Sequence, residues 1–351
     1  MDDLDQFRIT LQQLEIAREL VLARGETGCR VSLILLDNVA ETILCRIIQS
    51  EFESDDFTRA VVPERYSSKA RHQIERVFAD KLHAVAKARR LPIAVVTTLL
   101  VLHAYRNVAY HRDTHNPVVL PLLARVALIA VADLFARTRA GIRISGVGGH
   151  QAPIEWLERY GAGRAFVDFD AVSRSIARQL KARVRPALPM LINGFAADVT
   201  SRIAGVRQIL TEQLPTPNEQ EINRILKRFE FRRANPDLES KLSADYRALI
   251  YKISSGRGAE VTRDEFVEAE TKFRSRYKSA HEQYQPKLTY SGLAAIEADI
   301  PELYAARNYR GALERYAALD AQVTTFEEVT SAAHRQFEYQ LEMESDIRRG
   351  K

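Results

Sequence analysis

The chain has 351 residues, of which 46% are hydrophobic and 28% are charged. This composition is ordinary for a folded protein, so it excludes wholesale disorder and collagen-like repetition. Lysine and arginine (51) outnumber aspartate and glutamate (46), and the formal net charge is +5. Such an excess is compatible with a nucleic-acid partner without demanding one. Two cysteines exclude a secreted scaffold held together by disulfides, and we expect a cytoplasmic location.

Two apolar runs, residues 91–105 and 117–135, are the candidates for membrane insertion. The first is shorter than the roughly 20 residues that a spanning helix needs. Arg125 and Asp133 interrupt the second, and each would cost about 2.5–3.5 kcal/mol in the bilayer. The N-terminus is acidic and amphipathic, unlike a signal peptide. We therefore expect both runs to be core helices and the protein to have no membrane partner.

Apolar residues recur every three to four positions along most of the chain, which predicts helices. Gly25 is expected to end the first helix, and Pro92 stands where a helix-starting proline belongs. The polar segment 53–68 is predicted to be a loop or a short helical insertion. The predicted helices of a compact bundle over residues 1–140 cover 4–24, 31–52, 69–89, 93–111 and 117–138.

A glycine-rich stretch predicts a linker over residues 141–165. Residues 166–351 are then expected to form a helical C-terminal domain, so the predicted fold class is all-α. The segment 303–320 is similar to one half of a tetratricopeptide hairpin, but no second copy follows at a period of about 34 residues. The predicted helices of this domain cover 169–214, 218–231, 236–254, 262–285 and several pieces between 291 and 344.

The segment LHAYRNVAYHRDTHNP, residues 102–117, carries the strongest chemical signal. Arg106, Asn107 and His111 lie at the end of one apolar helix, and another apolar helix follows. Arginine stays charged and can hold phosphate oxygens in a planar fork, whereas histidine titrates near neutrality and can act as acid or base. Other arginine–histidine pairs have similar spacing, but none has this context. The alternative is that both side chains only cap a helix end.

This segment resembles the HEPN superfamily, whose signature is an arginine, usually followed by a polar residue, with a histidine a few positions later. The resemblance covers about residues 1–140, and it implies a HEPN-like helical bundle that dimerises to bring two motifs into one RNA-cleaving site. It also implies that Arg106 binds the scissile phosphate, that His111 acts as acid or base, and that Asn107 positions them. No metal or other cofactor is expected.

The predicted function is a metal-independent endoribonuclease of the toxin–antitoxin or phage-defence type. Its partners would be RNA, a second copy of the chain, and an antitoxin or a protein of a defence complex. Two alternatives remain open. The chain could be a non-catalytic HEPN-like subunit that binds RNA or supports assembly, or it could be a helical scaffold that binds proteins.

Two basic clusters are candidates for binding the phosphate backbone, because lysine and arginine stripes neutralise phosphates. The alternative for both is a solvated helix face. The second group comprises Arg224, Lys227, Arg228, Arg232 and Arg233. The first, which we predict as the RNA-binding stripe, comprises Arg174, Arg178, Lys181 and Arg185.

Other polar residues carry weaker signals. Asp37 and Glu41 lie one helical turn apart and could orient Arg106, or they could be ordinary polar-face residues. His115 could join His111 in binding a metal, but no acidic or thiol cluster accompanies the pair, so no metal site is predicted.

The two cysteines, Cys29 and Cys45, lie on one predicted helix. At about 1.5 Å per residue they are too far apart to form a disulfide. We expect both to be small buried hydrophobic residues.

Overall fold

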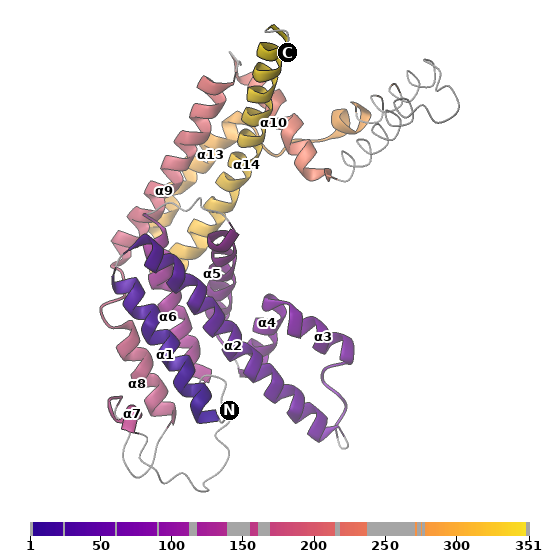
Figure 1. Cartoon of the computed structure of the whole chain (residues 1–351). Coiled ribbons are helices and arrows are strands. Elements are labelled where there is room, and N and C mark those ends of the chain that lie inside the picture. The colour runs from indigo at the N-terminus through magenta and orange to yellow at the C-terminus, as the bar shows by residue number, and fades with distance from the viewer. Residues whose placement is uncertain are drawn as a thin grey trace. The chain divides into compact units, whose positions relative to one another are not determined.

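The residues that the computed structural model describes are 3–23, 25–59, 62–89, 91–111, 118–138, 155–160, 169–214, 218–236, 271, 275 and 278–348. Within these ranges the secondary structure is helical and contains no strand (Figure 1), which confirms the predicted all-α fold class. No helix in the described ranges is long and apolar enough to cross a membrane.

The chain divides into two compact units, each built from two stretches of sequence. The first unit comprises Met1–Asp198 and Glu302–Ala317, and the second comprises Val199–Pro301 and Ala318–Lys351. This division does not coincide with the boundary near residue 140 that the glycine-rich stretch suggested.

Helix α8 (Phe169–Lys181) explains why the first unit extends beyond the predicted bundle. Its apolar side is buried at Val172, Ile176 and Leu180, and the helix packs mainly on α6 (Leu120–Thr138). Burial of this stripe joins α8 to the N-terminal helices. Most of the predicted linker lies outside the described residues, apart from the short helix α7 (Glu155–Glu158) and two residues after it.

The core of the first unit is formed by α1 (Asp3–Leu22), α2 (Glu26–Thr58), α5 (Ile93–His111) and α6. Helix α6 is buried on nearly every side, which explains its continuous apolar sequence. Phe7 of α1 lies with its ring centroid 5.1 Å from that of Phe135, and both side chains are fully buried. The two apolar runs are therefore core helices, as predicted.

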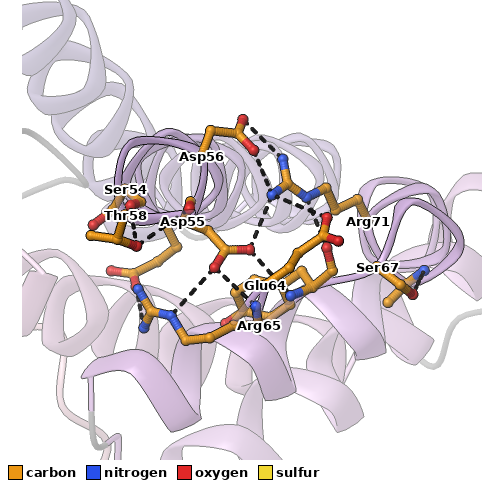
Figure 2. Close-up of polar contacts among 11 residues, drawn as sticks. Ser54, Asp55, Asp56, Thr58, Glu64, Arg65, Ser67 and Arg71 are labelled. Carbon is orange, nitrogen blue, oxygen red and sulfur yellow. Dashed lines mark hydrogen bonds and ion pairs between the residues drawn. The ribbon is translucent and has the colours of Figure 1, made fainter. Parts of the chain in front are cut away.

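Helix α2 continues to Thr58, so the first six residues of the predicted polar segment 53–68 are helical. The connection to the next helix is held by Asp55, whose carboxylate accepts from the backbone N–H groups of Arg65 (2.9 Å) and Tyr66 (3.2 Å). The guanidinium of Arg71 adds a contact of 3.0 Å (Figure 2). The hydrogen bond from the N–H of Arg65 lowers the pKa of Asp55 most, and Tyr66 and Arg71 lower it further. Burial alone would raise this pKa, but these contacts outweigh burial and hold the pKa below its usual range.

The prediction of a single helix over residues 69–89 is wrong, because the structure has two helices there. Helix α3 (Ser68–Arg76) has no buried residue, whereas α4 (Phe78–Arg89) buries Phe78, Leu82 and Val85. Val77 between them has extended backbone. The break lets α4 turn its apolar side toward α2, and α3 and α4 lie beside the second half of α2 (Figure 1).

The predicted single helix 169–214 is also wrong. Helix α8 ends at Lys181, α9 (Leu188–Gln208) begins after a gap, and a π-helical turn (Ile209–Gln213) follows. Pro186 lies in the gap, where a proline removes a backbone donor and disfavours helix in the preceding residue. Arg183 has a φ of 65°, a left-handed conformation typical of residues just past a helix end.

The second unit contains α10 (Glu219–Ala234), α13 (Tyr290–Asp299) and parts of α9 and α14 (Tyr309–Arg348). Between α13 and α14 lies a 3₁₀-helix (Ile300–Ala305). Helix α13, this 3₁₀-helix and the 40-residue α14 are the several helical pieces predicted between residues 291 and 344. The predicted helix 236–254 lies outside the described residues except for residue 236. Of the predicted helix 262–285 the structure describes residues 271, 275 and 278–285, and residues 278–283 are helical.

A cluster of charged side chains joins α9 to α14 within the second unit. Arg202 donates from Nε to Glu327 at 2.8 Å and from Nη2 to Thr324 at 2.7 Å. It also forms an ion pair with Asp320. Burial opposes the charge on Arg202, but these partners outweigh it and raise its pKa above the ordinary value.

Candidate functional site

Arg106 lies near the C-terminal end of α5 and faces α2. The buried residues Leu99 and Leu102 precede it at helical spacing, so the core-facing side of α5 directs Arg106 toward α2. Its Nε atom lies 3.1 Å from Oδ2 of Asp37, whose side chain is 6% exposed. Asp37 therefore makes the orienting contact that the sequence allowed, and it is more than an ordinary polar-face residue.

His103 belongs to the same group of side chains, although the sequence analysis did not select it. Its Nδ1 lies 2.9 Å from Oδ1 of Asp37, and its ring stacks on Phe78 with centroids 3.9 Å apart. Because a carboxylate accepts hydrogen bonds, this contact orients Nδ1 as the donor nitrogen of the ring. The available signal was the three-residue spacing from His103 to Arg106, which places both on one helix face.

Two amide side chains complete the surroundings of the guanidinium. Nη1 of Arg106 donates to Oδ1 of Asn107 at 2.9 Å, and Nη2 donates to Oδ1 of Asn38 at 3.4 Å. The predicted pair Arg106 and Asn107 is therefore in contact. We call Asp37, Asn38, His103, Arg106 and Asn107 the Arg106 site.

Glu41 does not contact Arg106 in the described contacts; it binds a lysine of α4 instead. Nζ of Lys81 lies 2.6 Å from Oε1 of Glu41 and 3.4 Å from Sγ of Cys45. Neither cysteine forms a disulfide, and Cys29 is buried as predicted. The prediction that Cys45 is buried is wrong, because its side chain is partly exposed.

His111 is the last residue of α5, but its side chain and the whole of His115 lie outside the described residues. The structure therefore does not give the distance between the Arg106 guanidinium and the His111 imidazole. In the part of the chain that is described, no group of three or more histidine, cysteine, aspartate or glutamate side chains could hold a metal ion.

A small cavity lies beside the Arg106 site. Its volume is about 10 Å³, and Asp37, Phe78, Leu99 and Leu102 are among the residues that line it. A cavity of this size holds about one water molecule. A nucleotide does not fit into it, so a substrate of the Arg106 site would have to bind at the surface of the unit.

The predicted RNA-binding stripe is only partly available to a ligand. Arg174 and Arg178 are exposed on α8. Nζ of Lys181 lies 2.6 Å from Oδ1 of Asp133 on α6, and the guanidinium of Arg185 lies over the ring of Tyr309, 5.9 Å from its centroid. Arg185 is nevertheless exposed, so Arg174, Arg178 and Arg185 carry the exposed charge of the stripe, whereas Lys181 is paired.

The second basic group is largely paired within the second unit. Arg224 contacts Glu221 at 2.8 Å, and Arg233 contacts Glu328 at the same distance. Arg232 donates to Gln336 at 2.6 Å. These contacts favour a solvated, internally paired surface over a phosphate-binding one.

Comparison with known proteins gives no relative for this chain. No protein-family model, no curated protein and no solved structure matches it.

Proposed function

We propose that the protein is a metal-independent endoribonuclease of the HEPN type that acts as a dimer. The observation that carries the proposal is the guanidinium of Arg106, held 3.1 Å from the buried carboxylate of Asp37 in the helix that ends at His111. A fixed arginine, together with a histidine five positions later, would supply the charge and the proton transfer that phosphodiester cleavage requires.

In this mechanism the ribose 2′-hydroxyl attacks the adjacent phosphorus, and the bond from phosphorus to the leaving 5′-oxygen breaks. His111 takes the proton of the 2′-hydroxyl, and a second acid protonates the leaving oxygen. Arg106 stabilises the charge that develops on the phosphate oxygens. The products carry a 2′,3′-cyclic phosphate and a 5′-hydroxyl.

Dimerisation supplies the second acid. Arg106 and His111 are five positions apart, which is about 140° around a helix, so one motif does not place both on one face. Two motifs that face each other would combine the arginine of each protomer with both histidines. The water-sized cavity beside Arg106 is consistent with a site that is completed by a second surface.

The other members of the Arg106 site act as positioning residues. Asn38 and Asn107 contact the two terminal nitrogens of the guanidinium, and His103 shares the carboxylate of Asp37 with Arg106. Each restricts the rotation of Arg106, and precise placement of a charged group contributes strongly to catalysis.

The test is cleavage of end-labelled RNA by the purified chain in excess EDTA. We expect cleavage with cyclic-phosphate ends, and a loss of about 10²–10⁴-fold in rate for His111→Ala and a comparable loss for Arg106→Ala. The matched controls are His83→Ala and Arg8→Ala, two exposed side chains that should leave the rate unchanged. Undiminished cleavage by His111→Ala and Arg106→Ala would refute the proposal.

The exposed pair Arg174 and Arg178 favours a second candidate, a non-catalytic subunit that binds RNA. Binding through these two side chains would weaken steeply with salt, and the double substitution to alanine would reduce the salt dependence. RNA binding without cleavage by the wild type would support this candidate. Growth arrest on expression, relieved by His111→Ala, would instead identify a toxin.

A further inference from the structure

Cys45, Glu41 and Lys81 form a second cluster of reactive side chains, which the proposed RNA cleavage does not use. Cys45 and Glu41 lie one turn apart on α2, and Lys81 reaches them from α4. Nζ of Lys81 contacts both the thiol and the carboxylate. Because the Lys81 side chain is only 5% exposed, it is confined to this position.

An open hollow gives small molecules access to the cluster. Its volume is about 340 Å³, roughly ten times the share of one water molecule in the liquid. The hollow is lined by Gln6, Glu41, Thr42, Cys45, Arg46 and Gln49.

The other cysteine is an internal control. Cys29 is 0% exposed, and burial raises the pKa of its thiol. Reactive cysteines are partly exposed and lie near positive charge, whereas buried ones are inert. Cys45 meets both conditions, whereas Cys29 is buried, and its burial outweighs the charge of Arg125.

We propose that Cys45 and Lys81 form a reversible covalent sulfur–nitrogen link between α2 and α4 when the protein meets hydrogen peroxide. In the first step the thiolate of Cys45 attacks one peroxide oxygen, the O–O bond breaks, and a sulfenic acid and hydroxide form. In the second step the amine of Lys81 attacks the sulfur, the S–O bond breaks, and water leaves. One peroxide is reduced to two waters, and the thiol and amine together lose two hydrogens.

The geometry of the cluster brings the reacting groups together. Burial acts to lower the pKa of Lys81, but its contacts with Glu41 and Cys45 outweigh it and raise the pKa. The positive charge of Lys81 lies 3.4 Å from the sulfur that attacks the peroxide. For the second step Glu41, 2.6 Å away, accepts the proton that Nζ must lose. The two reacting atoms start 3.4 Å apart, so the ring closure needs little movement.

The experiment is mass spectrometry of the full chain after treatment with hydrogen peroxide and proteolysis. We expect one linked peptide pair that contains Cys45 and Lys81, about 2 Da lighter than the sum of its parts, and its loss after reduction with dithiothreitol. Before oxidation, iodoacetamide should alkylate Cys45 at least about tenfold faster than Cys29.

Three variants test the assignment. Lys81→Arg keeps the positive charge beside Glu41 but has no amine, so we expect a sulfenic acid that dimedone traps and no link. Cys45→Ser should abolish both products, and Cys29→Ser should change neither. Circular dichroism of each variant checks that it folds. Dimedone-trapped Cys45 without a link in the wild type, a disulfide between two chains, or equal alkylation of both cysteines would overturn the proposal.

Discussion

Replacement of Asp37 by asparagine tests the central contact of the Arg106 site. The substitution keeps the shape of the side chain and removes its charge. Asp37 lies 3.1 Å from Nε of Arg106 and 2.9 Å from Nδ1 of His103. Both contacts therefore lose the negative charge of the carboxylate, while the packing of α2 against α5 is retained.

The size of the effect follows from these two contacts. A hydrogen bond to a charged group contributes about 1.5–3 kcal/mol to stability. Arg106 and His103 are each 23% exposed, so water compensates part of the loss, and asparagine still accepts one hydrogen bond. We expect Asp37→Asn to lower the free energy of unfolding by about 2–3 kcal/mol.

Urea denaturation followed by circular dichroism measures this change. The matched control is Asp5→Asn, which removes the charge from an exposed pair with Arg8 on α1 and should change the free energy of unfolding by no more than about 0.5 kcal/mol. Because Asp37 acts through Arg106, Asp37→Asn should also slow RNA cleavage less than Arg106→Ala does. Equal stability of Asp37→Asn and Asp5→Asn would refute the contact geometry.

Four further substitutions test the packing and the charges. Gly194→Ala on α9 should lower the free energy of unfolding by about 1–3 kcal/mol because its methyl group would overlap a buried leucine of α6. In contrast, the methyl group of Gly205→Ala on the same helix meets nothing within 4 Å, so this variant should raise the free energy of unfolding by up to about 1 kcal/mol. A change in the same direction for both variants would contradict the packing of Gly194. Arg202→Met should lower the free energy of unfolding by about 2–4 kcal/mol, because it leaves two carboxylates of α14 without their partner. An unchanged free energy of unfolding in urea denaturation would contradict the charged cluster between α9 and α14. The pKa of Asp55 is lowered, so its contribution to stability is complete above the unfolded-state pKa of about 3.9 and is lost as the pH falls through the folded-state value. Amide exchange in the loop that Asp55 holds should therefore be faster in Asp55→Asn than in the wild type at neutral pH, and the two should converge at acidic pH.

The helical class and the positions of the core helices could be predicted from the sequence. Helices α5 and α6 follow from apolar residues at helical spacing, because this spacing is a local property that packing against any apolar partner reinforces. The helix break at Pro186 could also have been predicted, since proline acts through its own backbone. The break at Val77 has no such signal, because the burial of α4 and the exposure of α3 produce it.

The members of the Arg106 site illustrate what depends on tertiary structure. The sequence singled out Arg106 and Asn107 as neighbours, and it left Asp37 with two interpretations. Only the packing of α5 against α2 brings Asp37 to Arg106 and adds His103. The exposed stripe on α8 is a similar case, because Lys181 meets Asp133 only after α8 packs on α6.

Local spacing thus determined which residues share a helix face, because the geometry of one helix depends only on its own backbone. The tertiary structure decided which faces meet, because that depends on how well whole apolar surfaces fit each other. The contact of Cys45 with Lys81 is of this second kind. Side chains far apart in the sequence acquire partners only when their helices pack, and both proposed chemistries of this protein depend on such partners.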